Sequence, residues 1–229
     1  MNRTLIYDLP TRIFHLLFAC LFTGAFLVAK TIDDENPLFS YHMLSGLLLA
    51  FLVILRLIWG IFGAKYARFS SFAIHPVELF NYLKGILGGS KRTWPGHNPA
   101  SSWAALFMFT FALGLAVTGF LMTTGQKERF EDAHEFLANG FLVTTLMHVS
   151  GVVLHMICHK DGLAMSMVHG KKKTLPLTEP GNTHYVVSII FILLISIFSA
   201  GMIRNYNENE GSLTFLGNRM KLDQQGLSK

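Results

Sequence analysis

Charged residues are scarce in this chain of 229 residues, because Asp, Glu, Lys and Arg make up only 14% of it, where about 25% is usual for a soluble domain. Apolar residues reach 51%, and the mean hydropathy is +0.41. The length suits one or two domains. This composition excludes a disordered chain, argues against an ordinary soluble domain, and is typical of a protein that lies in a lipid bilayer.

Cysteine is nearly absent, with only Cys20 and Cys158 in the whole chain. Two cysteines cannot build a disulfide framework or a cysteine-rich metal site. The chain also lacks a C-x-x-C-H sequence, which excludes covalent attachment of a c-type haem.

Five apolar runs dominate the remainder, each close to the roughly 20 residues that a helix needs to cross the hydrocarbon. They cover about 13–29, 42–62, 103–124, 136–158 and 185–203. The first run follows basic residues, as the apolar part of a signal peptide does. Asp8 and His15, and the lack of an A-x-A cleavage site before Lys30, favour a membrane helix instead.

The net charge is +5, but the charges lie between the apolar runs, so we expect contact with membrane lipid and not with nucleic acid. Eleven basic residues lie before the first run or after the second and fourth: Arg3, Arg12, Lys65, Arg68, Lys84, Lys91, Arg92, Lys160, Lys171, Lys172 and Lys173. The alternate loops hold Lys30, Lys127 and Arg129. The positive-inside rule therefore predicts a cytoplasmic N-terminus and, after five crossings, an external C-terminus.

The segment 65–102 is the longest one outside the runs. Pro76, Pro95 and Pro99 break any long helix there. Residues 75–87 fit a short interfacial helix, with Phe80 and Leu83 on its apolar face. We expect no second domain in this segment.

Histidine carries the functional information. His134 and His148 are 14 residues apart, which places them on one face of a helix and about 21 Å apart along it. His42 opens the second run and His15 lies near the start of the first. At matching depths, His42 therefore pairs with His134 near the outer surface, and His15 pairs with His148 near the cytoplasm.

Two histidines that face each other from different helices are what a b-type haem with two axial His ligands requires. Two such pairs predict two haems stacked across the bilayer. The alternative is a set of histidines that are hydrogen-bonded within a helical bundle.

Three further features bear on such sites. Gly46 and Gly151 lie close to the faces of His42 and His148; they either make room for a macrocycle or serve ordinary helix packing. Arg56 either pairs with a haem propionate or extends to the interface. His155 either assists a quinone or, as we favour, contacts lipid headgroups.

Several short motifs resemble bacterial cytochrome b561 proteins of the nickel-iron hydrogenase b-subunit type. The N-terminal one is Y-D-L-P-T-R-I-F-H, from Tyr7 to His15. The others are H-M-L-S-G from His42, R-L-I-W-G from Arg56, G-H-N-P-A from Gly96, T-G-F from Thr118, H-E from His134, H-V-S-G-V from His148 and M-V-H-G-K-K from Met167. The resemblance covers roughly residues 5–173, and the fifth run departs from members that have four spans.

The resemblance implies an all-α fold: an integral membrane four-helix bundle in residues 1–173 with two b-type haems between its helices. Residues 174–229 then add a fifth transmembrane helix and an external tail. The resemblance also assigns His15 and His148 to the cytoplasmic haem, and His42 and His134 to the outer one. It implies a location in the bacterial inner membrane.

Family members exchange electrons between the quinone pool and a redox partner, such as a hydrogenase, a formate dehydrogenase or a periplasmic c-type cytochrome. The D-L-P-T-R opening is closer to members that work with small c-type cytochromes. We therefore expect an electron-transfer subunit of a quinone-linked oxidoreductase. One alternative is a self-contained quinol-linked reductase of superoxide or ferric iron, and others are a haem-free proton relay or membrane anchor.

Overall fold

The computed structural model describes residues 3–89, 92, 94, 96–159, 163–173, 178–215 and 217–222. This part of the chain contains five long helices: α1 (Leu9–Thr31), α2 (Ser40–Phe62), α4 (Pro99–Leu121), α5 (Lys127–His159) and α7 (Tyr185–Asn205). Four segments are long and apolar enough to cross a membrane, and the longest, Pro99–Cys158, contains both α4 and α5. The protein is thus a helical integral membrane protein, and each predicted run lies within or largely overlaps one helix.

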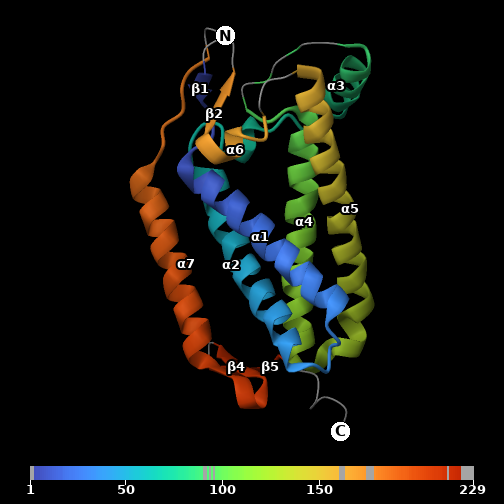
Figure 1. The fold of residues 1–229 in the computed structure, drawn as a ribbon, viewed down its shortest axis with the longest axis vertical. Helices are drawn as coiled ribbons and strands as arrows, with labels where there is room; N and C mark the ends of the chain where they lie inside the picture. The colour runs from blue at the N-terminus through green and yellow to red at the C-terminus, as the bar shows by residue number, and fades with distance from the viewer. Residues whose placement is uncertain are drawn as a thin grey trace.

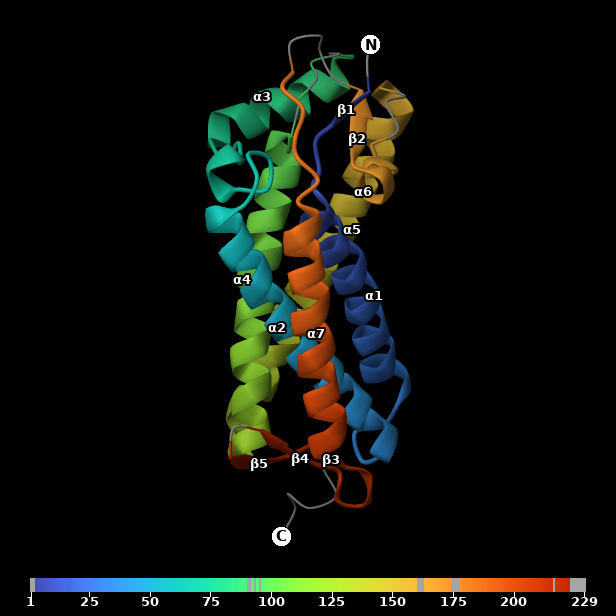
Figure 2. The same cartoon turned by 90° about the vertical axis from the view of Figure 1, so that its left-hand side faces the viewer.

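The helices α1, α2, α4 and α5 form a bundle, in which α4 packs against α5 and α1 packs against α2 (Figure 1). The fifth helix, α7, contacts α1 and α2 and lies along the side of the bundle (Figure 2). Most side chains on the middle of α7 are exposed, including Ile189, Leu193 and Ile197. Exposed aliphatic side chains on a long apolar helix are suited to contact with lipid.

Local sequence signals explain where the helices begin and reverse. The Asp8 carboxylate accepts a hydrogen bond from the Thr11 backbone N–H and caps α1, while the Asn98 side chain does the same for α4 through Ser101. Between α4 and α5, the turn Met122–Gln126 includes Gly125 at φ +91°. Glycine adopts this left-handed conformation without steric cost, so the chain folds back and α4 and α5 become a hairpin.

The N-terminal end of the bundle, at the top of Figure 1, is closed by short elements. The strands β1 (Arg3–Leu5) and β2 (Lys171–Lys173) pair antiparallel beside the short helix α6 (Ser166–His169). The helix α3 (Pro76–Leu87) lies across this end and confirms that residues 75–87 form a short helix. Its exposed apolar side chains are Val77, Phe80 and Leu83. Single turns at Pro37–Phe39 and Phe69–Ser71 complete the loops.

The opposite end carries a small antiparallel sheet that hydropathy did not predict. Its strands are β3 (Tyr206–Asn207), β4 (Ser212–Phe215) and β5 (Asn218–Lys221), with a turn at Glu208–Glu210 between the first two. Leu213, Met220 and Leu222 form a buried cluster on Met43, Leu44 and Leu47 of α2. We call this end the sheet end. The structure does not describe Lys91 and Lys160, two of the basic residues behind the predicted orientation, or the last residues, 223–229.

Candidate functional site

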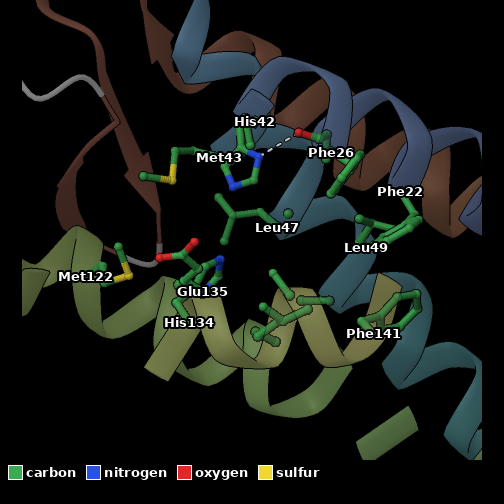
Figure 3. Close-up of a pocket in the computed structure, with 18 of the residues that line it drawn as sticks. Phe22, Phe26, His42, Met43, Leu47, Leu49, Met122, His134, Glu135 and Phe141 are labelled. Carbon is green, nitrogen blue, oxygen red and sulfur yellow. Dashed lines mark hydrogen bonds between the residues drawn. The ribbon is translucent and has the colours of Figure 1, made fainter. Parts of the chain in front are cut away.

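His42 on α2 and His134 on α5 face each other at the sheet end. Their ring centroids are 6.3 Å apart and the ring planes are nearly perpendicular, at 77°. The two rings point toward each other across a cavity (Figure 3). The structure therefore brings together the first of the two predicted pairs.

Hydrogen bonds leave the same nitrogen available on both rings. His42 Nδ1 lies 2.9 Å from the Ala25 carbonyl oxygen, which can only accept, so this Nδ1 carries the proton. The Thr118 hydroxyl can donate its single proton to the Gly114 carbonyl oxygen, 2.8 Å away. The Thr118 hydroxyl oxygen then accepts a hydrogen bond from His134 Nδ1 at 2.8 Å. Each Nε2 then has a free lone pair, and its ring is held by a partner of the kind that metal-ligating histidines use.

The cavity between the rings has a volume of about 480 Å³. Most of its wall is apolar and includes Phe22, Phe26, Leu47 and Phe141. Gly46 lines it, and a methyl group added there would meet no atom within 4 Å. Such a cavity is suited to a large flat apolar group.

The spacing of the rings fits a metal between them. Two metal–imidazole bonds of about 2 Å each, with about 1 Å more from each nitrogen to its ring centroid, give a separation of about 6 Å. No cluster of three or more His, Cys, Asp or Glu side chains that could hold a bare metal ion occurs in the described residues. Two histidines across an apolar cavity fit an iron whose other ligands come from a macrocycle.

Acidic side chains line the outer rim of the same cavity. Asp33, Asp34, Glu131 and Glu135 lie there with Lys30 as the basic member. Lys127 joins the two sides of the rim, with its Nζ 3.0 Å from Asp34 and 3.6 Å from Glu131. The loop between α1 and α2 is thereby fixed to the start of α5.

The second predicted pair, His15 on α1 and His148 on α5, lies toward the N-terminal end. Both histidines are close enough to His97 to lower the pKa of its imidazole electrostatically. Burial is the main cause of that shift, which takes the pKa of His97 to about 3, and Arg56 and Lys172 also contribute. Gly151, one turn beyond His148, faces open space, because an added methyl group would meet nothing within 4 Å.

Arg56 is buried at 3% exposure, which argues against the alternative in which its side chain extends to the interface. Its Nη2 donates to the Ala67 carbonyl at 2.9 Å, and its Nη1 is buried with no hydrogen-bond partner among the described residues. The rings of Phe14, Phe69 and Phe109 surround it, with centroids 5.4 to 6.0 Å from its guanidinium carbon. An unpaired nitrogen on a buried cation indicates room for an anionic partner.

The position of His155 corrects an expectation. Its side chain is 4% exposed, and its Nδ1 lies 3.2 Å from the Tyr82 hydroxyl on α3. A side chain so deeply covered by protein does not contact lipid headgroups. The hydrogen bond instead joins α3 to the end of α5.

Sequence reasoning missed His97, which lies in the loop before α4. Its loop turns inward because Asn98 caps α4 and Pro99 starts that helix. The ring then packs against Tyr7 and Phe72, at centroid distances of 5.7 and 4.9 Å. The motif G-H-N-P-A was the available signal, but the motif alone does not show that the loop enters the bundle.

Comparison with known proteins agrees with this geometry. Residues 6–170 match the family described as prokaryotic cytochrome b561. A relative from Rhizobium leguminosarum bv. viciae, named probable Ni/Fe-hydrogenase B-type cytochrome subunit, is 25% identical in an alignment that covers 73% of this chain and 87% of the relative. No solved structure matches the chain. The family match spans well over half of the chain, so this membrane protein belongs to the prokaryotic cytochrome b561 family and transfers electrons by b-type haem.

Proposed function

We propose that the chain binds two b-type haems and conducts electrons across the bacterial inner membrane between quinone and a redox partner outside the cytoplasm. The observation that supports this most strongly is the His42–His134 pair, with its 6.3 Å ring separation across a cavity of about 480 Å³. The relative named as a hydrogenase cytochrome subunit supports a partner subunit. The D-L-P-T-R opening favours a periplasmic c-type cytochrome as that partner.

In this proposal His42 and His134 hold one haem, and His15 and His148 hold the other. Haem held in this way would supply reversible one-electron chemistry, and a histidine on each side would favour electron transfer over oxygen chemistry. The chain's own residues set the geometry: Ala25 and Thr118 orient the rings, and Gly46 and Gly151 leave space beside them. Arg56 supplies a buried positive charge near the second pair.

Orientation follows from charge. Ten of the fourteen acidic residues lie in the loop between α1 and α2, in the first turns of α5 and in the C-terminal tail: Asp33, Asp34, Glu35, Glu128, Glu131, Asp132, Glu135, Glu208, Glu210 and Asp223. The excess of Lys and Arg belongs to the opposite loops, so the N-terminal end faces the cytoplasm in this proposal. The acidic rim at the sheet end then offers a docking face for a basic partner.

Electron transfer by the purified chain in liposomes tests the proposal. Quinol in the bilayer should reduce both haems, and an external soluble c-type cytochrome should reoxidise them. Sustained turnover with oxygen, superoxide or ferric chelate and no protein partner would instead favour a self-contained reductase. A colourless, folded chain made with haem available would contradict haem-based transfer and favour a proton relay or an anchor.

A further inference from the structure

Arg56 Nη1 and His97 Nδ1 are two of five buried nitrogen atoms at the N-terminal end that have no hydrogen-bond partner among the described residues; the others are Arg12 Nε, Trp94 Nε1 and Trp103 Nε1. Buried polar atoms are nearly always paired, because an unpaired one loses its hydration without compensation. The two residues come from distant segments, α2 and the loop before α4, and Arg56 acts electrostatically on His97. Two unpaired nitrogens in one region suggest a common ligand.

The nearby carboxylate does not fill that role. Asp8 Oδ1 accepts from the Thr11 backbone N–H at 2.9 Å, and Asp8 Oδ2 accepts from Trp59 Nε1 at 3.0 Å. Asp8 is therefore committed to capping α1 and to holding Trp59 of α2. The Asp8 charge still acts on Arg56, but Arg56 Nη1 keeps no hydrogen-bond partner among the described residues in the bundle interior, where a missing bond is costly.

His97 is placed as firmly as Arg56. Its ring lies between Tyr7 and Phe72, and its backbone leads directly into the Asn98 cap of α4. Lys172 stabilises the same loop, because its Nζ donates to the Trp94 carbonyl at 2.7 Å. The imidazole is thus held by packing, and a fixed ring gives its nitrogen a defined direction for a ligand.

The ligand must be an anionic oxygen group. One nitrogen belongs to a guanidinium, which prefers carboxylate or phosphate oxygens, and the neighbouring Lys172 is also basic. His15 and His148 lie close to the same imidazole. A haem held by these two histidines would supply propionate carboxylates, which are anionic oxygen groups of this kind.

We propose that His97 and Arg56 together bind a propionate of the haem held by His15 and His148, an inference that rests on the proposed function. Arg56 Nη1–H and an N–H of His97 donate to the carboxylate oxygens. The pairing neutralises the propionate and thereby favours the reduced iron, which raises the reduction potential of this haem. The other cavity is rimmed by four carboxylates and one lysine, so at equilibrium an electron favours the haem at the N-terminal end.

A redox titration of the purified chain in lipid nanodiscs, followed at the haem absorption bands, tests the proposed binding of a propionate by Arg56 and His97. We expect Arg56→Gln to lower one of the two midpoint potentials by about 59 mV, equivalent to a tenfold change in the reduction equilibrium. His97→Leu should lower the same potential by less, and His97→Asn, which keeps a donor, should restore it. His75→Leu is the matched control, because His75 is exposed in a loop at the same end, and it should change neither potential.

Two results would overturn the proposed binding of a propionate. One is unchanged midpoint potentials in both Arg56→Gln and His97→Leu, and the other is an equal shift in the midpoint potentials of both haems. If His97→Leu does not fold, Arg56→Gln decides alone, with Arg56→Lys as its charge-conserving control; an unchanged potential in Arg56→Gln then overturns the proposed pairing. Titrations in nanodiscs of phosphatidylcholine alone and of phosphatidylcholine with phosphatidylglycerol distinguish a haem propionate from a lipid headgroup as the anionic group. A potential that depends on the anionic lipid would assign the two nitrogens to a headgroup, whereas a wild-type chain without two haems would contradict the proposed function itself.

Discussion

Replacing Leu213 by alanine tests how firmly the small sheet is docked on the bundle. Leu213 is 0% exposed and packs with Met220 and Leu222 on Met43, Leu44 and Leu47 of α2. Met43 and Leu47 also line the cavity between His42 and His134. The sheet therefore covers one wall of that cavity.

Removing a buried leucine side chain costs about 2–5 kcal/mol. Because each 1.4 kcal/mol is a factor of about ten, detachment of the sheet becomes about 30-fold or more easier. Hydrogen exchange of the amides in β4 and β5 measures this opening locally. We expect Leu213→Ala to speed exchange in 212–221 and to leave α4 and α5 unchanged.

Thr214→Ala is the matched control, because Thr214 is the next residue in β4 and its side chain is exposed. Successive side chains of a strand point to opposite faces, so this change should have almost no effect. Equal exchange in both variants, or faster exchange throughout the bundle, would refute the docking of the sheet through Leu213.

Three other changes have defined outcomes. Gly46→Leu should fill the cavity and remove one haem, as counted by pyridine haemochrome. The control Gly201→Leu on α7, where an added methyl group also meets nothing within 4 Å, should retain both haems. Equal haem content in the two variants would contradict the role of Gly46. Trp59→Phe should lower the free energy of unfolding by about 1–3 kcal/mol, since it leaves buried Asp8 without its 3.0 Å donor; an unchanged denaturation midpoint would show that this bond contributes little. The 2.7 Å ion pair of Lys65 and Glu179 lowers the pKa of Glu179. Its contribution to stability is therefore present above the ordinary glutamate pKa of 4.5 and is lost as the pH falls below that value. Hydrogen exchange of the amides of residues 178–184 should become faster in acid in the wild-type chain, and this effect should disappear in Glu179→Gln.

Hydropathy predicted the helices because each apolar run must be about as long as the bilayer is thick. It could not place their polar ends. The helix α5 begins at Lys127, whereas the fourth run begins at Phe136, because the charged turns Lys127–Glu135 continue the helix beyond the apolar part. Charged residues alone do not set the boundary of a helix. Here the turn at Gly125, with its positive φ, separates α5 from α4.

The sheet at the opposite end escaped prediction for a different reason. Its strands have at most four residues, too few for a clear alternation of apolar and polar side chains. They are held by packing on α2, which no local pattern reveals. Gly211 and Gly217, both with positive φ, mark the turns on either side of β4, and they were the usable signals.

The pairing of His42 with His134 could be predicted because helix period and depth both follow from residue numbers. The burial of His97 could not, since it depends on a loop that packs against Tyr7 and Phe72, which are distant in the sequence. His155 was misjudged for a related reason: its cover comes from Tyr82 on α3, 73 residues away in the sequence. Contacts of this kind are tertiary, and a single sequence does not contain them.

A count of haem in the purified chain and its histidine variants tests the central claim most directly. Pyridine haemochrome and reduced-minus-oxidised spectra should give two b-type haems in the wild-type chain and one in His42→Ala. His134→Ala should also give one, with the same spectrum as His42→Ala, because both variants lose the haem at the sheet end. A folded wild-type chain without haem, or two haems retained in both variants, would contradict the account.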